Sequence, residues 1–244
     1  MTVVGDRTAQ ALEVSIRDWE AGGYASSYRR TVGLWWDELE RALIVGSVWP
    51  RAGMRVLDAG SGVGRLTFAL AAADCQVVAL DFSLRSLRFL PIRSRFPPPR
   101  ILALAASLTD PLPIADESMD AVVSGQVVQH IPSGELRVRA WQHLARVTQR
   151  GGRLGAVLYK DWPGEESEGY FDSGLFFHRY TSVDLARELR SAGWEPSQMS
   201  AWYRRMWSSE LPTIVPKSIE TAAAASHVAD HSARYLLVNA IRSA

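Results

Sequence analysis

The regular alternation of short apolar runs and amphipathic stretches after Arg55 restricts the fold of this 244-residue chain more than any other feature. Near-continuous apolar runs such as VVAL and AVV are typical of strands that are buried on both faces. The stretches between them place apolar residues at helical spacing. Because parallel strands need a crossover connection, strands that alternate with helices predict a parallel sheet with helices on both sides.

The expected elements follow from this pattern and from the residues at their ends. We predict strands over 55–59, 76–81, 100–106, 119–125 and 153–159, and two later strands, over 195–207 and 233–241, that complete the sheet. We predict helices over 63–73, 83–90, 133–149 and 182–193. Ser182 is the expected N-cap of the last helix, and Gly193 is its expected C-cap.

The chain before Pro50 is expected to be helical, because Leu34, Leu39 and Leu43 recur at helical spacing after a Gly/Ser-rich break over 22–30. We therefore predict a helical cap over residues 1–50 and an α/β domain over 51–244. The expected fold is a doubly wound, mostly parallel, seven-stranded Rossmann-like sheet with this N-terminal helical cap.

The most informative motif is the stretch VLDAGSGVGRLTFAL (56–70), in which a strand runs through alternating glycines into a helix. Glycines let the backbone take positive φ and approach a ligand, and the helix N-terminus attracts electron-rich groups. The dinucleotide pattern G-x-G-x-x-G fails here, because Arg65 stands at its last glycine position. Asp58 also disfavours a pyrophosphate and favours a cationic ligand, and no GK[ST] follows for a P-loop.

This stretch resembles the first motif of class I S-adenosylmethionine (SAM) dependent methyltransferases. In that family, the glycine turn lies under the amino-acid part of SAM, and the preceding acid orders the turn and helps to hold the SAM amine. The resemblance therefore implies that Asp58, Gly60, Gly62 and Gly64 bind the cofactor.

Two further stretches match the same family. QVVALDFS (76–83) is a strand that ends in Asp81, whose carboxylate suits the two hydroxyls of a ribose; its other possible role is as a helix N-cap. Phe82 is expected on the adenine side. In ASLTDPLPIADESMDAVVSG, the family often has Asp where this chain has Ser107, so we expect a hydrogen bond to adenine from Ser107 and one from the backbone N–H of Leu108.

The reacting centre is expected at the carboxyl ends of the strands, where ligands bind in doubly wound sheets. Residues that follow the fourth and fifth strands should therefore line it. We expect Gln126 to contact the cofactor and three other side chains to contact the methyl acceptor, namely Gln129, Tyr159 and Trp162. His130 is the candidate general base, since histidine is the usual proton acceptor near neutral pH; its alternative is a histidine that packs within the scaffold.

An aromatic residue of the N-terminal segment is implied, by the same resemblance, to close over SAM. Tyr28, inside the Gly/Ser-rich break, is the expected residue. The face of an aromatic ring attracts a sulfonium cation by about 1 kcal/mol.

The segment 161–180 is the most distinctive part of the predicted domain, because it inserts between the fifth strand and the next helix. Its first half is acidic and its second half, from Tyr170, is aromatic. Long insertions of this kind are often lids, so we expect it to close over an apolar or cationic acceptor, with Tyr170 against the acceptor. The alternative is a solvated run of charges.

The resemblance implies an enzyme that transfers a methyl group from SAM, leaving S-adenosylhomocysteine (SAH), to an O or N atom of a small or medium organic acceptor. Two alternatives stay open: methylation of a peptide N-terminal amine or a tRNA base, and SAM binding by a non-catalytic subunit. The net charge of +1 argues against nucleic acid, which needs a basic surplus.

Composition also bears on the compartment and on metals. Cys75 is the only cysteine, which excludes an internal disulfide and a cysteine-rich metal site. No secretory signal is visible, and no apolar run is long enough to span a membrane. We therefore expect a cytoplasmic enzyme without a metal.

Overall fold

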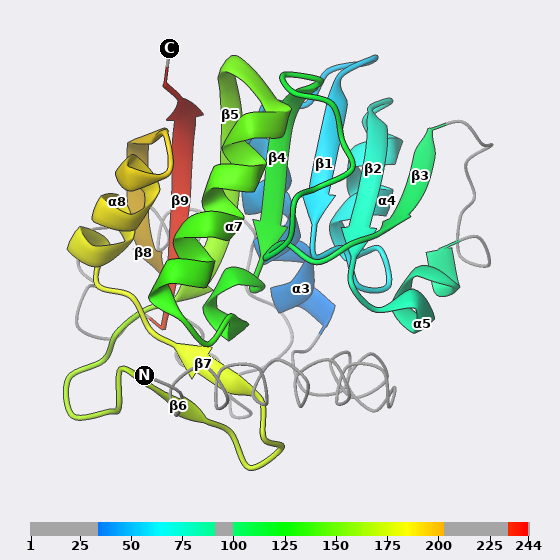
Figure 1. Cartoon of the computed structure of the whole chain (residues 1–244). Coiled ribbons are helices and arrows are strands. Elements are labelled where there is room, and N and C mark those ends of the chain that lie inside the picture. Colours follow the sequence, from blue (N-terminus) through cyan, green and yellow to red (C-terminus); the bar gives the residue numbers. More distant parts are fainter. Residues whose placement is uncertain (1–33, 91–99, 203–233, 244) are drawn as a thin grey trace.

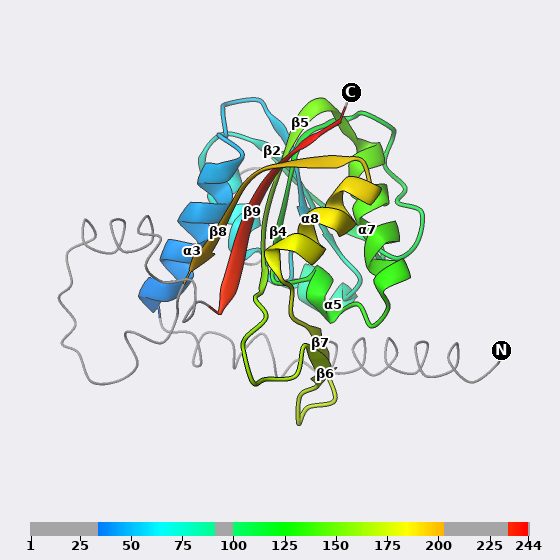
Figure 2. The same cartoon turned by 90° about the vertical axis from the view of Figure 1, so that its left-hand side faces the viewer.

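The computed structural model describes residues 34–90, 100–202 and 234–243, which form a twisted central sheet with helices on both faces (Figures 1 and 2). In this part of the chain the main sheet has seven strands, in the order β3-β2-β1-β4-β5-β9-β8. A separate two-stranded sheet, β6-β7, lies near the end of the main sheet to which β1 and β4 point (Figure 1). The strands are β1 (Arg55–Ala59), β2 (Gln76–Asp81), β3 (Ile101–Ala105), β4 (Met119–Gly125), β5 (Thr148–Tyr159), β6 (Glu168–Tyr170), β7 (Phe176–His178), β8 (Trp194–Trp202) and β9 (Tyr235–Arg242).

Strand directions confirm the predicted fold class. The five strands from β3 to β5 pair in parallel, and β9 runs antiparallel between β5 and β8. The predicted bounds of β1, β2 and β4 match the observed ones, because their continuous apolar runs are largely buried. The prediction was wrong at β5, which begins at Thr148 instead of Arg153 and leaves a shorter helix before it.

The helices form two layers, with α3 and α4 on one face of the sheet and α7 and α8 on the other (Figure 2). In the α7–α8 layer the N-caps are side chains: Ser133 caps α7, and Thr181 caps α8 by accepting a hydrogen bond from the Asp184 N–H. The expected N-cap Ser182 was therefore wrong by one residue, whereas Gly193 does follow the α8 C-cap with a positive φ of 88°. The helices are α3 (Leu34–Ser47), α4 (Arg65–Ala72), α5 (Leu84–Leu87), η1 (Val128–His130), α7 (Gly134–Val147) and α8 (Ser182–Ser191).

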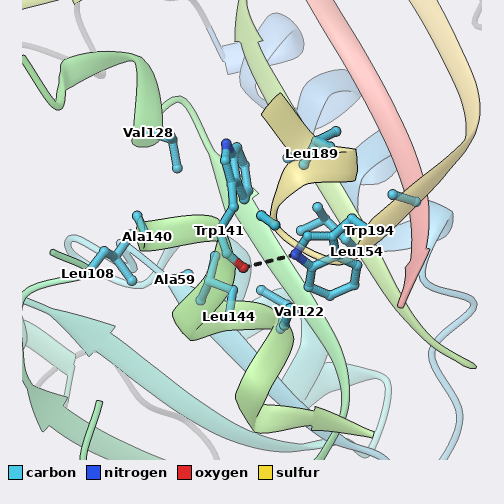
Figure 3. Close-up of a cluster of buried hydrophobic side chains, with 14 of the residues drawn as sticks. Ala59, Leu108, Val122, Val128, Ala140, Trp141, Leu144, Leu154, Leu189 and Trp194 are labelled. Atoms are coloured by element: carbon cyan, nitrogen blue, oxygen red, sulfur yellow. Dashed lines mark hydrogen bonds between the residues drawn. The ribbon is translucent and has the colours of Figure 1, made fainter. Parts of the chain in front are cut away.

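The main core lies between the sheet and the α7–α8 layer (Figure 3). Two fully buried tryptophans, Trp141 of α7 and Trp194 of β8, anchor it, and the Trp194 indole N–H donates to the Trp141 carbonyl (3.0 Å). Pairing that polar atom removes the cost of burying it, so both rings contribute their apolar area in full. This core holds the strand ends that carry the site.

Helix α3 confirms part of the expected N-terminal helical cap and packs closely on the sheet. A Cβ at Gly155 of β5 would overlap the Ser47 side chain of α3, so glycine is required for this close approach. The remainder of the expected cap, including Tyr28, lies outside the described residues.

The insertion over 161–180 is a β-hairpin rather than an irregular loop. Strands β6 and β7 pair antiparallel, with Tyr170 opposite Phe176. Leu175, Phe176 and Phe177 are buried against the domain, whereas Tyr170 and Phe171 are exposed. The acidic stretch 163–168 is also exposed, as the alternative of a solvated run of charges expects. None of the described helices is long and apolar enough to cross a membrane.

Candidate active site

The glycine turn joins β1 to α4 at the carboxyl end of the sheet. The backbone N–H groups of Gly60 and Ser61 both donate to the Leu80 carbonyl at 2.8 Å, which fixes the turn to β2. Gly60 has a φ of 82°, and a Cβ there would overlap the Val127 side chain. Gly64 caps α4 with a φ of 90°. Gly60 and Gly64 therefore supply the positive φ angles of the turn, and Gly60 also leaves room for the Val127 side chain of the loop after β4.

Asp58, the penultimate residue of β1, is 1% exposed and only partly satisfied. Its Oδ2 accepts a hydrogen bond from the Thr67 hydroxyl (2.6 Å), whereas its Oδ1 has no hydrogen-bond partner among the described residues. Burial raises the pKa of Asp58 to about 6, against the opposing effects of Thr67 and the Arg65 charge. A buried carboxylate oxygen without a partner is costly, so the site fits a ligand that brings a cation or a donor.

The turn next to Asp58 is also suited to a ligand. The Ser61 hydroxyl is buried and has no hydrogen-bond partner in the described part of the chain. A Cβ built at Gly62 would meet nothing within 4 Å, so the backbone there is open to a close approach. The cofactor roles expected for Asp58, Gly60, Gly62 and Gly64 stay predictions that this geometry allows.

Asp81 ends β2 and holds two backbone segments together. Its Oδ2 accepts from the Gly62 N–H (2.7 Å) and its Oδ1 from the Ser83 N–H (2.8 Å). The N-cap of α5 is Ser83, whose hydroxyl accepts from the Ser86 N–H, so the alternative role of Asp81 as an N-cap is wrong. Burial raises the pKa of Asp81. Each carboxylate oxygen keeps a second acceptor position, which suits a diol.

The residues expected on the adenine side follow β2 and β3. Phe82 is half-buried beside Asp81. The Ser107 hydroxyl shares a hydrogen bond with the Thr109 hydroxyl (2.7 Å), and the buried Leu108 accepts at its carbonyl from His143 Nδ1 (3.0 Å). These contacts fix the loop that carries Ser107 and Leu108.

A buried ion pair that sequence reasoning missed lies between the turn and the end of β4. Glu40 of α3 accepts from Arg65 Nη2 through Oε1 and from Gln126 Nε2 through Oε2, both at 2.6 Å. Gln126, expected at the cofactor, has a left-handed φ of 60°, and its backbone N–H donates to the Val157 carbonyl. No local pattern links Glu40 to Gln126, because they are 86 residues apart in the chain.

His130 ends η1, just after β4, and is 8% exposed. Its Nδ1 lies 2.7 Å from the Phe176 carbonyl, which can only accept, so Nδ1 carries the proton and Nε2 is the basic nitrogen. Burial lowers the pKa of His130 to about 4, so the ring is neutral at pH 7. The Tyr159 ring stands edge-on to it, with centroids 5.5 Å apart.

Gln129, the residue before His130, is fully buried. Neither atom of its amide has a hydrogen-bond partner among the described residues. Tyr159 extends an aromatic cluster from His130 to Phe171 and Tyr235, with ring centroids 6.2 and 5.8 Å away. The structure therefore brings the rings of His130 and Tyr159 into contact, and it buries the Gln129 amide one residue before His130.

The hairpin residues expected at the acceptor have different surroundings. The Trp162 ring lies 4.0 Å from the Arg234 guanidinium carbon in a cation–π contact. Tyr170 is 57% exposed and contacts Phe176 edge-on. Glu165 forms ion pairs with Arg179 and Arg234, so the acidic half of the hairpin is partly neutralised. Among the described residues, no group of three or more His, Cys, Asp or Glu side chains could hold a metal ion.

The strand order and the glycine turn define a Rossmann-like domain of the class that binds nucleotide cofactors. Residues 57–156 match the methyltransferase domain family. An uncharacterised methyltransferase of Mycobacterium tuberculosis is 37% identical over 108 residues, which cover 44% of this chain and 41% of that relative. A malonyl-[acyl-carrier protein] O-methyltransferase of Methylococcus capsulatus is 32% identical over 158 residues, which cover 60% of this chain and 54% of the relative. The chain thus spans about half the length of these curated relatives.

A solved structure with the same fold is the 1,6-didemethyltoxoflavin-N1-methyltransferase of Burkholderia thailandensis, with bound 1,6-didemethyltoxoflavin and S-adenosylhomocysteine. It aligns with a TM-score of 0.69 over 97% of this chain and 90% of that chain, at 18% identity. At this identity the likeness shows the fold. The chain therefore has the fold of these methyltransferases, and its residues 57–156 are similar to the methyltransferase domain family.

Proposed function

We propose that this chain transfers the methyl group of SAM to an O or N atom of a small or medium organic acceptor. The observation that carries the proposal is the glycine turn between two buried strand-end carboxylates, Asp58 and Asp81, inside the segment that matches the methyltransferase domain family. A cationic donor suits the unsatisfied Asp58 oxygen, and a ribose diol suits Asp81.

We call the residues around the turn (Asp58–Gly64, Asp81–Ser83 and the Ser107–Leu108 loop) the donor half of the site. When bound, SAM supplies an electrophilic methyl group on a sulfonium sulfur. In the donor half, Asp58 favours the cation electrostatically, and Asp81 fixes the turn through the Gly62 N–H. Tyr28 is proposed to close this half from the N-terminal side.

The acceptor half comprises η1, Tyr159 and the β6–β7 hairpin. Here His130 is proposed to accept, at Nε2, the proton that an O–H or N–H acceptor loses, while Nδ1–H stays bonded to the Phe176 carbonyl. The buried Gln129 amide is proposed to bind a polar group of the acceptor, because a ligand would satisfy both of its atoms. Tyr159 and the hairpin aromatics would exclude water.

Two of the similar proteins support a small acceptor. One is named an O-methyltransferase, and the other is named an N1-methyltransferase and holds the small molecule 1,6-didemethyltoxoflavin in its structure. The hairpin charges also favour a neutral acceptor over a peptide ammonium, since the Glu165 carboxylate is paired with Arg179 and Arg234. A lid that selected an ammonium would keep this carboxylate available.

A transfer assay with methyl-labelled SAM over separate pools of metabolites, peptides and tRNA tests the proposal. We expect label in the metabolite pool. Label confined to the peptide or the tRNA pool would overturn the acceptor class. SAM binding by calorimetry without label in any pool would overturn catalysis and leave a SAM-binding subunit.

A further inference from the structure

The buried Glu40–Arg65 ion pair has no role in the chemistry proposed above, yet it lies against the donor half. Glu40 is fully buried, and its two oxygens bind Arg65 and Gln126 at 2.6 Å each. One carboxylate thus joins helix α3, the first residue of α4 and the loop after β4. Burying an ion pair in this way contributes little stability compared with apolar packing.

The Arg65 guanidinium places a positive charge beside the glycine turn. Arg65 follows the glycine turn directly, and its guanidinium is near enough to Asp58 to lower the pKa of that carboxyl. SAM carries a positive sulfonium, whereas its product SAH has a neutral thioether in that position. An uncompensated guanidinium beside the turn would therefore oppose the donor more than the product.

Glu40 supplies the compensating charge from outside the matched family segment. Three carboxylates of the described residues, Asp58, Asp81 and Glu40, lie at the turn together with the Arg65 guanidinium. The formal charges of these four groups give a negative net charge, which suits a cation. The Glu40 carboxylate also binds the Gln126 side chain. The position of Gln126 and the net charge beside the turn therefore both depend on Glu40.

We propose that Glu40 is a positioning residue of the donor half, which acts through Arg65 and Gln126 to make the site prefer the cationic donor SAM over the neutral product SAH. The inference rests on the proposed function. It assigns to α3 a part in donor selection and in product release, because a site that binds SAH less tightly than SAM is less inhibited by its product.

The test is the substitution Glu40→Gln, measured by calorimetric titration with SAM and with SAH. Glutamine keeps the size and can still accept from Arg65, and the Gln126 amide can turn to present its oxygen, so mainly the charge is removed. We expect the SAM Kd to rise about tenfold and the SAH Kd to rise less than about threefold. The matched control is Glu135→Gln on α7, whose exposed pair with Arg139 should change neither constant.

The double variant Glu40→Gln with Arg65→Gln removes both charges and keeps the balance of the site. Its ratio of SAH to SAM affinity should return to within about twofold of the wild-type ratio, which a purely structural role of Glu40 would not restore. If Glu40→Gln alone fails to fold, the double variant is compared with Arg65→Gln, which keeps the Glu40 charge. The affinity ratio should favour SAM about tenfold more in Arg65→Gln than in the double variant, and equal ratios would overturn the role of Glu40.

The outcomes separate the two proposals. A wild-type protein that binds neither SAM nor SAH overturns both the proposed function and the role of Glu40. A wild-type protein that binds SAM, with a Glu40→Gln variant whose two constants rise in parallel or stay unchanged, overturns the role of Glu40 alone.

Discussion

The donor half and the acceptor half meet at the same edge of the sheet, but they are built over very different distances in the sequence. In the donor half, the Asp81 carboxylate bonds to Gly62 and Ser83, and Asp58 bonds to Thr67, all within 19 residues of one another in each pair. In the acceptor half, His130 is oriented by the Phe176 carbonyl, 46 residues away, and Tyr159 packs on Tyr235.

This difference has a functional meaning. A short motif fixes the donor half, so the same turn can serve many chemistries, whereas the acceptor half depends on an insertion that is free to vary. We therefore expect substitutions in the donor half to alter SAM affinity, and substitutions in the acceptor half to alter turnover or acceptor affinity.

The largest effect is expected in the acceptor half, from His130→Ala. If His130 accepts the proton, kcat should fall about 100-fold or more, up to about 10⁴-fold, while the SAM Kd stays nearly unchanged. Because burial lowers the pKa of His130 to about 4, its neutral form dominates at neutral pH, and wild-type activity should not decline with His130 protonation until the pH falls below about 5. Steady-state kinetics across pH would measure both. A loss under threefold at every pH would leave His130 as scaffold.

In the donor half, Asp81→Ala should weaken SAM binding by roughly 5- to 150-fold, which corresponds to the loss of hydrogen bonds to a charged group, about 1–3 kcal/mol. The variant loses the bonds to the Gly62 and Ser83 N–H groups as well as the proposed ribose contact. Calorimetry measures the change, with the exposed Asp110→Ala as a control. Equal SAM affinity in Asp81→Ala and wild type would remove Asp81 from the donor half.

A smaller effect is expected from pH on SAM binding. Because burial raises the pKa of Asp58 to about 6, the free carboxyl is protonated below that pH and ionised above it. A cationic donor favours the ionised form, so SAM affinity should rise about tenfold from pH 5 to pH 7. The control is Asp58→Asn, in which the profile should flatten. A wild-type profile that is already flat would contradict the role of Asp58.

The smallest effect is expected from Phe171→Ala in the hairpin. Phe171 is partly exposed and contacts Phe177 and Tyr159, with ring centroids 4.7 and 6.2 Å away. Its loss should raise the acceptor KM about fivefold, through lost apolar contact, and leave the SAM Kd unchanged. Val183→Ala, an exposed site on α8, is the matched control. A rise in the SAM Kd with no change in KM would assign Phe171 to the wrong half.

The contrast between the halves also explains what the sequence could predict. Strands β1, β2 and β4 and the turn were predictable, because apolar runs and alternating glycines are local signals. The hairpin was not, because the burial of Phe176 and Phe177 depends on packing against η1. Glu40 was missed because its partners, Arg65 and Gln126, are brought to it only by the packing of α3.

The residue roles were likewise easier to predict in the donor half than in the acceptor half. Asp81 could be selected from its place at the end of an apolar run, and its bond to the Gly62 N–H supports that choice. The pKa of His130 could not be predicted, because it depends on burial by the hairpin. Its residue type suggested a base that titrates near neutral pH, whereas its surroundings make it a neutral ring with a fixed tautomer.

The most direct test of the donor half is a calorimetric titration of the wild-type chain with SAM and, separately, with NAD. The glycine spacing and the buried Asp58 carboxylate favour a cation and disfavour a pyrophosphate. We predict saturable binding of SAM and no binding of NAD at the same concentrations. NAD that binds more tightly than SAM would contradict the assignment of this site to a methyl donor.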